Sequence, residues 1–374
     1  MRVCHVCNQH PVDDGRVFHR ACVGLAEAGY EVHLFGVGNG TQVYTERGVF
    51  VHPLPQNQSR LERFARCRRV AQMAADIKPD LFHVHEPELL GPMIARAGSR
   101  PVVYDVHESY LDILKERDWI PAWLRPFVRA VWDRWESRLV RRCAGVVVVT
   151  EQIAQRYYRL HDKVQVISNY PDLSAIENLP PVTRDGATCV FAGSITPDRG
   201  LPQVFRAFAI LRERGVAVRL KLAGDVISQE YLRSLWCEAD RLNIRDLIDY
   251  RGMLPRQEAI ILQKEASIGL VPYLPVANSV AGMPNKLVEC MAVGIPVVFS
   301  DFSNYRNIAG TSGAGIAVDP TRPGGIADAI EYLVHNPDIA RQMGEAGKRA
   351  VYERFNWNLE RIKLVKLYQK VLGG

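Results

Sequence analysis

The chain has 374 residues, of which 47% are hydrophobic and 24% charged, with 28 glycines and 22 prolines. This length predicts two to three domains, and the composition excludes a disordered, collagenous or coiled-coil protein. The net charge of +6 is too small over this length to indicate nucleic-acid binding. No apolar run is long enough to span a membrane and residues 1–10 lack the apolar core of a signal peptide, so we expect a cytoplasmic protein.

The first half of the chain alternates short β-branched runs with helical patterns, as in parallel sheets built from β-α-β units. Strands are predicted at 3–6, 31–35, 49–54, 81–85, 102–106, 145–149 and 164–167, and helices at 17–28, 61–77, 89–97, 123–142 and 151–160. This order predicts a doubly wound α/β domain over residues 1–168.

Eight cysteines are scattered without the spacing of a disulfide framework, which fits a reducing compartment. The run Cys4-His5-Val6-Cys7 resembles half a zinc site. It falls in a predicted strand, however, where positions i and i+3 point to opposite faces, and no second closely spaced pair follows. We therefore expect these cysteines to be structural and predict no metal ligands.

Residues 169–186 contain three prolines and little apolar periodicity, which predicts a linker. Strands at 188–192, 218–223, 247–251, 268–271, 297–300 and 315–318 then alternate with helices at 202–213, 229–242, 256–264, 285–293, 324–334 and 337–353. The pattern predicts a second Rossmann-like domain over 187–355, facing the first. Residues 356–374 should form a helix that packs back on the body, with a possible crossing to the N-terminal domain.

Ligands of open parallel sheets bind at the carboxyl ends of the strands, so the segments that follow the strands are the candidate binding motifs. Residues 8–16, after the first strand, contain one glycine and no G-x-G-x-x-G, which disfavours an NAD-dependent dehydrogenase. The chain also lacks a P-loop and the G-x-S-x-G turn of α/β-hydrolases.

The first strand of the second domain runs into the turn AGSITPDRG at 192–200, followed by a helix. Glycines allow close backbone approach, a helix N-terminus offers N–H groups, and Arg199 adds a fork of donors, which together favour a phosphate site. The alternative is a tight strand-to-helix turn with a surface arginine.

Further on, Lys286 lies in the first turn of the helix at 285–293, from which its ammonium could reach a bound anion. Glu289 lies one turn later on the same side, and a carboxylate there could accept hydrogen bonds from two adjacent sugar hydroxyls. The alternative is a surface Lys–Glu pair at i,i+3.

These segments occur in an order that resembles a known family. The chain contains DDGRVFHRACVGLAEAGYEV, VVYDVHES, VISNYPD, FAGSITPDRG, LAGD, YRGML and MPNKLVECMAVGIPVV. In this order, and over essentially the whole chain, they resemble the retaining GT-B-fold glycosyltransferases of family 4, also called glycosyl transferases group 1. Ordered recurrence is more specific than any one of the motifs.

Carried over residue by residue, the resemblance implies a donor site in the second domain. Arg199 and Lys286 would hold the donor diphosphate, Glu289 would bind the ribose, and His107 of the first domain would contact the transferred sugar. The alternative for His107 is a hydrogen-bonded histidine at a strand end. The other positions that would shape the pocket around the phosphates and the base are Gly193, Ser194, Gly200, Gly224, Asp225, Met253, Asn285 and Leu287.

The chain departs from the family pattern at two positions. Ala281 stands where the family has the first glutamate of its E-x7-E pair, so the resemblance leaves the donor sugar open, and Ser194 stands where a basic residue is common. Our hypothesis is that Lys286 replaces the missing charge. Because the sequence contains no D-x-D, we expect catalysis without a metal ion.

The resemblance implies transfer of a sugar from a UDP- or GDP-linked donor to a saccharide or lipid-linked saccharide, with retention of configuration and no separate cofactor. Cell-surface polysaccharide assembly is the expected setting. A nucleotide-sugar 2-epimerase on the same fold and a non-catalytic nucleotide-sugar-binding scaffold are the alternatives.

Two stretches of the first domain are rich in basic residues. Five arginines between 60 and 69 accompany a single acid, and residues 115–142 hold eight basic and four acidic residues with four tryptophans. Basic residues interleaved with tryptophan are typical of helices that dock on anionic lipid, so peripheral membrane contact at the inner face of the plasma membrane is one expectation. The other is that the tryptophans are core and the arginines solvated.

Overall fold

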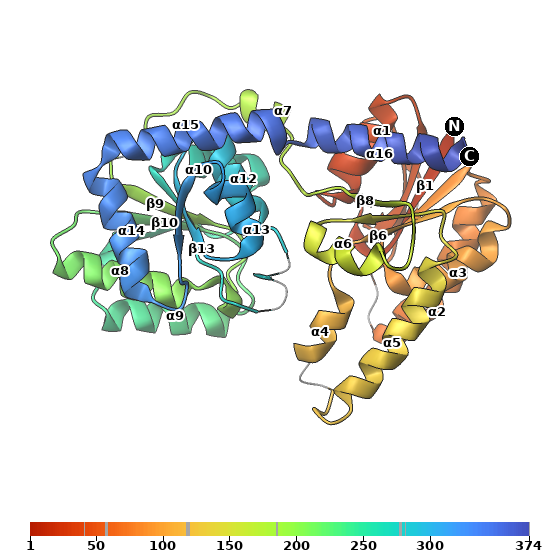
Figure 1. Cartoon of the computed structure of the whole chain (residues 1–374), viewed down its shortest axis with the longest axis horizontal. Helices are drawn as coiled ribbons and strands as arrows, with labels where there is room; N and C mark the ends of the chain where they lie inside the picture. The colour runs from red at the N-terminus through yellow and green to blue at the C-terminus, as the bar shows by residue number, and fades with distance from the viewer. Residues whose placement is uncertain are drawn as a thin grey trace. The chain divides into compact units, whose positions relative to one another are not determined.

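In a computed structural model, the chain divides into two compact units (Figure 1). Unit 1 comprises Met1–Asn169 and Trp357–Gly374, and unit 2 comprises Tyr170–Asn356. The structure describes residues 1–40, 42–56, 59–116, 120–184, 186–276, 279–280 and 282–373, without the side chains of residues 60, 116 and 175. Each unit is a Rossmann-like α/β domain on a mainly parallel sheet, which confirms the predicted fold class.

The sheet of unit 1 has eight strands in the order β3-β4-β2-β1-β5-β6-β7-β8. Every pairing is parallel except β3 with β4, which is antiparallel. The strands are β1 (Arg2–Pro11), β2 (Glu31–Val37), β3 (Tyr44–Glu46), β4 (Val49–Leu54), β5 (Leu81–Val84), β6 (Val102–Val106), β7 (Gly145–Val148) and β8 (Val164–Val166). The helices are α1 (Val23–Glu27), α2 (Arg60–Asp76), α3 (Pro87–Ala97), α4 (Tyr110–Glu116), α5 (Arg125–Val140), α6 (Glu151–Tyr157) and α16 (Trp357–Leu372).

The two faces of this sheet have separate apolar cores. Cys4 lies in one core and Cys7 in the other, because successive side chains of β1 alternate between the faces. The two cysteines therefore point apart, as predicted for a strand, and cannot share a zinc ion.

Helix α16 closes the core that contains Cys7. Its Trp357, Leu364 and Tyr368 are buried there together with Val3 of β1, and Figure 1 shows it beside α1. The C-terminal helix therefore folds with the first 169 residues.

Unit 2 has a six-stranded parallel sheet in the order β11-β10-β9-β12-β13-β14. The strands are β9 (Thr188–Ala192), β10 (Arg219–Ala223), β11 (Ile248–Tyr250), β12 (Ile268–Val271), β13 (Val297–Ser300) and β14 (Gly315–Val318). The helices are α7 (Ser174–Glu177), α8 (Leu201–Glu213), α9 (Gln229–Arg241), α10 (Arg256–Glu265), α12 (Asn285–Ala292), α13 (Ser303–Tyr305), α14 (Pro323–His335) and α15 (Pro337–Arg354).

The segment 169–186, expected as a linker, is in large part built into unit 2. It contains α7, and Leu173, Ile176 and Leu179 are buried in the core of the unit. These apolar residues recur every third position, which suits one face of a short helical turn.

Local structure differs from the sequence-based expectation at three places. Strand β3 is an exposed antiparallel edge strand with no apolar alternation to reveal it. Helix α4 was not predicted. The helix expected at 17–28 is a π-helical turn over Val17–Cys22 that continues into α1. Across the part of the chain that the structure describes, no helix combines the length and apolar character needed to cross a membrane.

Candidate functional site

Two glycines bring the backbone of β9 and β10 together at the carboxyl edge of the unit 2 sheet. Gly193 follows β9 and its N–H donates to the Ala223 carbonyl over 2.9 Å. Gly224 follows β10 with φ +153°, and a Cβ atom there would lie 1.7 Å from the Gly193 oxygen. A side chain is thus excluded at Gly224, and bare backbone lines this edge.

Arg199 lies in the turn that leads from this edge into α8. Gly200, with φ +77°, approaches the Pro272 carbonyl so closely that a Cβ atom would lie 2.1 Å from its oxygen. The Arg199 guanidinium lies over the Tyr273 ring, 4.2 Å from its centroid, and its Nε is 3.4 Å from Asp198 Oδ2. The arginine is therefore oriented before any ligand binds, while 29% of its side chain stays exposed.

Lys286 meets the same edge from the first turn of α12. A Cβ atom at Gly193 would lie 2.9 Å from Lys286 Cε, so this lysine packs over the glycine turn. Its Nζ donates to Glu289 Oε2 over 3.2 Å. The Lys–Glu pair foreseen as the alternative therefore exists, but it is not a surface pair, since the Glu289 side chain is only 5% exposed. Arg256 Nη2 lies 3.7 Å from the other Glu289 oxygen.

Tyr273, which follows β12, lies where these charges converge. It is buried, and burial raises the pKa of its hydroxyl. The positive charges of Arg199 and Lys286 partly offset this rise, whereas the negative charge of Glu289 adds to it. Sequence reasoning missed this residue, although its place two residues after a predicted strand put it at the carboxyl edge. We call Arg199, Lys286, Glu289 and Tyr273 the anion cluster.

The other predicted residues of unit 2 fall into two groups. Ser194, Asp225 and Met253 are exposed beside the two glycine turns, with Met253 following the Gly252 carbonyl that accepts from the Gly224 N–H. Asn285 begins α12, and its Oδ1 is buried without a hydrogen-bond partner within the described part of the chain.

Leu287 is placed differently from the rest of its motif. Its side chain is fully buried in the core, and its N–H donates to the Pro284 carbonyl over 3.1 Å. Neither its side chain nor its N–H is available to a ligand in this structure, so we assign it to the core. Ala281, where the family has a glutamate, lies outside the described residues.

In unit 1, His107 follows β6 and its side chain is 14% exposed. Its Nε2 lies 3.1 Å from His85 Nδ1 and 3.6 Å from Asp105 Oδ2. It is thus a hydrogen-bonded histidine at a strand end, as the alternative expected, and it also reaches the surface. Its ring lies 4.6 Å from that of His10.

Asp105 and Arg16 form a buried ion pair behind His107. Arg16 Nη2 donates to Asp105 Oδ1 over 2.8 Å and its Nε donates to Oδ2 over 3.3 Å. Burial alone would raise the pKa of Asp105, but the Arg16 charge together with His107 and His83 outweighs burial and holds that pKa well below the usual range. Sequence reasoning did not find this pair, because its members lie 89 positions apart.

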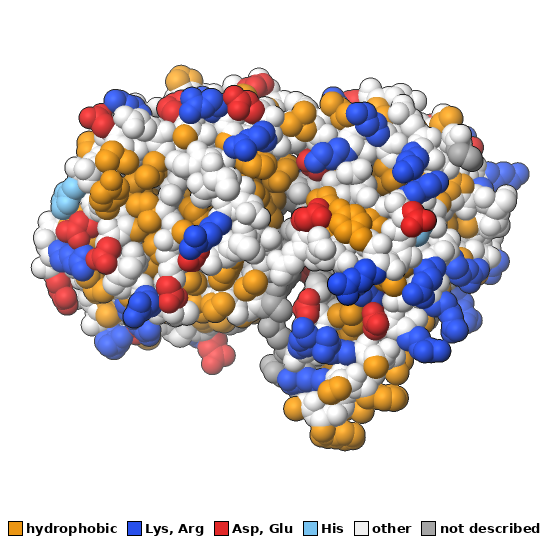
Figure 2. All heavy atoms as spheres, in the orientation of Figure 1, with side chains coloured by type: hydrophobic (Ala, Val, Ile, Leu, Met, Phe, Trp, Pro, Cys, Tyr) orange, Lys and Arg blue, Asp and Glu red, His pale blue; other side chains and the backbone are white. Residues whose placement is uncertain are grey.

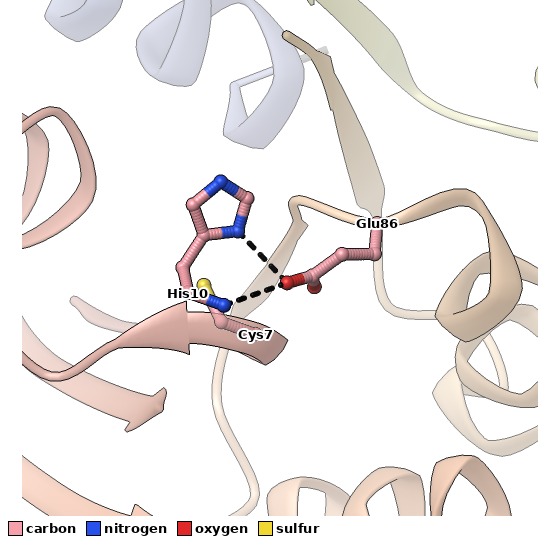
Figure 3. Close-up of side chains that lie close together, drawn as sticks. All are labelled: Cys7, His10 and Glu86. Carbon is pink, nitrogen blue, oxygen red and sulfur yellow. Dashed lines mark hydrogen bonds and ion pairs between the residues drawn. The ribbon is translucent and has the colours of Figure 1, made fainter. Parts of the chain in front are cut away.

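Glu86 bonds to the last residues of β1 (Figure 3). Its carboxylate accepts hydrogen bonds from the backbone N–H groups of Asn8, Gln9 and His10 and from His10 Nδ1 at 2.8 Å. Burial opposes ionisation, yet these donors, His10 first, hold the pKa of Glu86 below its usual value. Together they fix the carboxyl end of β1, on which His10 lies.

Two groups of described side chains have the composition of a metal site, namely Cys7 with His10 and Glu86, and His83 with His85 and Asp105. In the first group, Glu86 Oε1 already accepts three N–H groups, and burial raises the pKa of the Cys7 thiol, which opposes the thiolate that a metal needs. In the second group, ring nitrogens bond to neighbouring side chains. The contacts of both groups support structural roles.

Both halves of the chain are similar to known glycosyltransferase domains. Residues 15–170 match the model of the glycosyl transferase 4-like domain, and residues 180–350 match that of the glycosyl transferases group 1. The chain is 25% identical to the phosphatidyl-myo-inositol mannosyltransferase of Mycobacterium leprae, over 81% of this chain and 76% of that protein.

Among solved structures, the fold is similar to that of a sucrose-phosphate synthase from Thermosynechococcus elongatus, with a TM-score of 0.78, 17% identity, and coverage of 100% of this chain and 99% of that one. It is also similar to that of Anabaena HepE in complex with UDP, with a TM-score of 0.75, 14% identity, and coverage of 99% of this chain and 100% of that one.

Proposed function

We propose, because this chain belongs to the group 1 glycosyltransferases and has their GT-B fold, that it transfers a sugar from a nucleotide-diphosphate donor to a saccharide or lipid-linked saccharide. The observation that carries the proposal is the anion cluster, in which Arg199 and Lys286 meet bare glycine backbone at the carboxyl edge of a parallel sheet. The setting that we propose is assembly of a cell-surface polysaccharide.

Glycosyl transfer breaks the bond between the anomeric carbon and the diphosphate, so negative charge grows on the leaving group. Arg199 offers a fork of N–H donors and Lys286 a mobile ammonium. In the unliganded protein they pair with Asp198 and Glu289, respectively. We propose that the diphosphate takes over both cations, with Lys286 replacing the charge absent at Ser194.

Release of Lys286 to the diphosphate would remove its hydrogen bond to Glu289 Oε2, and this oxygen could then accept a hydrogen bond from the ribose. Its buried position beside the glycine turns supports this, since a desolvated carboxylate forms strong hydrogen bonds with two hydroxyls. The exposed Asp225 and Met253, together with the unpartnered Asn285 Oδ1, would border the nucleotide. UDP is the first nucleotide to test, because HepE was solved with it. GDP is the second.

For the reaction itself we propose retention of configuration, in keeping with the resemblance. The acceptor oxygen bonds to the anomeric carbon, the bond to the diphosphate breaks, and the acceptor proton passes to a phosphate oxygen. No protein nucleophile and no separate cofactor are then needed, and His107 contacts the transferred sugar. We also propose that no metal ion is required, since two cations already face the leaving group. EDTA should leave the rate unchanged, and loss of activity restored by Mg²⁺ or Mn²⁺ would contradict this.

A panel of nucleotide sugars tests donor binding by thermal shift. A ligand at 100 times its Kd stabilises a protein by about 2.7 kcal/mol, which is readily measured.

Slow release of UDP or GDP from the stabilising donor, in the absence of acceptor, would support a transferase and argue against a non-catalytic scaffold. An inverted product, seen in the anomeric NMR signals of the glycoside, would contradict retention.

The sharpest variant is Lys286→Met. A hydrogen bond to a charged group contributes about 1.5–3 kcal/mol, so donor Kd should rise roughly 10- to 150-fold. Lys363→Met is the matched control, because Lys363 also pairs with a buried glutamate three positions away, Glu360, at 2.7 Å. Unchanged donor affinity in Lys286→Met, or an equal loss in both variants, would overturn the proposal.

A second proposal concerns a stripe of exposed apolar side chains along α5 of unit 1. Trp123, Phe127, Val131 and Trp135 recur every fourth residue along α5 and the turn before it, and they are 80%, 65%, 53% and 38% exposed. Figure 2 shows apolar side chains gathered at the lower end of unit 1, with basic side chains nearby. Trp132 is half-buried, and Trp119 lies outside the described residues.

We propose that the stripe docks on an anionic lipid surface, which would bring a lipid-linked acceptor to the enzyme. The chain should co-sediment with phosphatidylglycerol vesicles and not with phosphatidylcholine vesicles. Phe127→Ser should reduce binding, whereas Phe64→Ser, which changes another exposed phenylalanine on α2, should reduce it less. Equal binding to both vesicle types would contradict an anionic docking surface.

A further inference from the structure

A series of neighbouring polar side chains runs through the core of unit 1, from His107 through Tyr368 of α16 to Asp105. His107 Nε2 lies 3.1 Å from His85 Nδ1, and His85 Nε2 lies 3.0 Å from His5 Nδ1. His5 Nε2 lies 3.1 Å from the Tyr368 hydroxyl, which lies 2.6 Å from His83 Nδ1. His83 Nε2 then faces Asp105 Oδ2 at 3.5 Å. We call this series the histidine relay.

The inner members of the relay are neutral. His5, His83 and His85 are at most 1% exposed. Burial lowers the pKa of all three, and for His5 and His85 the neighbouring His83 lowers it further. A neutral imidazole has one N–H and one lone pair, so it donates at one nitrogen and accepts at the other. Each hydrogen bond in the series therefore dictates the next, and only two directions are possible.

Asp105 selects between these directions. In one direction, every member from His107 onward donates to the next, and His83 Nε2 finally donates to Asp105. The N–H groups of His83 Nε2 and His107 Nε2 then face the carboxylate, and only the lone pair of His85 Nδ1, at 3.5 Å, is directed at the negative charge. In the reverse direction one N–H and two lone pairs face the same charge. Because Asp105 is ionised through its pair with Arg16, the first direction is electrostatically favoured.

The two hydrogen bonds of Tyr368 support the same direction independently. A hydroxyl that donates forms shorter bonds than an N–H that donates to oxygen. The 2.6 Å separation from His83 Nδ1 suits O–H donation to a lone pair, and the 3.1 Å separation from His5 Nε2 suits an N–H that donates to the tyrosine oxygen.

We propose that Tyr368 is a positioning residue, which acts through His5 and His85 to hold His107 as the tautomer that carries its proton on Nε2. The Nδ1 atom of His107 then keeps its lone pair and accepts a hydrogen bond from a sugar hydroxyl. The contact with the sugar rests on the proposed function, but the tautomer does not, because it follows from groups within unit 1.

The tautomer is measurable in the whole chain by two-bond ¹H–¹⁵N NMR correlation with ¹⁵N-histidine, at neutral pH and without donor. The wild-type His107 spectrum should show Nε2 protonated and Nδ1 bare. In Tyr368→Phe, His5 loses the acceptor that fixes its orientation, so His107 should become a mixture of both tautomers. Replacement of His107 by glutamine assigns its signals.

Tyr157→Phe is the matched control, since it removes the hydroxyl of another buried tyrosine in unit 1, which donates to Glu136 over 2.9 Å. It should leave the His107 signals unchanged. A wild-type His107 protonated on Nδ1, or an unaltered His107 tautomer in folded Tyr368→Phe, would overturn the proposal. The wild-type spectrum decides the direction of the relay even if the variant does not fold.

Sugar transfer gives a separate result. Loss of one oriented hydrogen bond should lower kcat in Tyr368→Phe about tenfold. If the tautomer shifts while kcat stays constant, the relay stands and the proposed contact between His107 and the sugar fails.

Discussion

Arg16→Met should destabilise unit 1 strongly, because it leaves the Asp105 carboxylate buried without its only arginine partner among the described residues. Arg16 and Asp105 are 6% and 2% exposed, and two hydrogen bonds join them. Removing one partner of a buried ion pair costs about 3–5 kcal/mol. With a urea dependence of roughly 2–3 kcal/mol per molar, the unfolding midpoint should fall by about 1–2.5 M.

The pH dependence of this loss has a definite sign. In the wild type, the folded pKa of Asp105 is depressed, so its contribution is complete above the unfolded pKa of about 3.9 and is lost only below it. Without Arg16, only His107 and His83 oppose the effect of burial, so the folded pKa of Asp105 should rise from its depressed value. The penalty then shrinks as pH falls through that higher folded pKa, so the difference in unfolding free energy between wild type and variant should be smaller at acidic than at neutral pH.

Tryptophan fluorescence during urea unfolding follows this change, since five of the six tryptophans lie in unit 1. Arg2→Met is the control, because Arg2 and Glu31 form an ion pair of 2.6 Å with side chains 39% and 42% exposed. It should have a far smaller effect. An Arg16→Met midpoint equal to that of Arg2→Met, or a gap that stays constant with pH, would refute the reasoning.

Three further outcomes are expected. Gly224→Ala should destabilise unit 2 by about 2–5 kcal/mol, because positive φ and a backbone clash at 1.7 Å act together, whereas Gly215→Ala, with φ +73° and open space around it, should cost less in thermal unfolding. Arg199→Met should lower kcat/KM for transfer roughly 10²- to 10³-fold, as expected for a donor to a developing charge, and an unchanged value would exclude it from the site. Ellman's reagent should modify Cys237 alone in the native chain, since the other seven cysteines are buried and burial raises the pKa of Cys67, for example, to about 12. More than one fast thiol would contradict this.

The fold and the donor-side motif were open to prediction because their signals are local. Alternating β-branched and helical segments predicted both sheets, and the glycine turns with Arg199 and Lys286 form short contiguous patterns. The local pattern does not show that the Leu287 side chain is buried. Leu287 adjoins Lys286 in the sequence, but consecutive helix positions differ by about 100° in direction, so one faces the glycine turn and the other the core.

The histidine relay could not be predicted, because its contacts are distant in sequence. His5 and Tyr368 lie 363 positions apart. The alignment of His5 with His83 depends on the register of β1 against β5. Each histidine alone has the pattern of a buried strand residue. Only the return of α16 to this sheet shows that they act on one another.

The return of α16 also bears on how the protein is made. Unit 1 lacks one wall of its core until Trp357, Leu364 and Tyr368 have left the ribosome, and all of unit 2 is translated in between. At roughly 5–20 residues per second this leaves the nascent domain incomplete for about 10–40 s. Its apolar face stays uncovered throughout that interval, so the need for chaperones during translation should fall on unit 1 and decrease once α16 has been made.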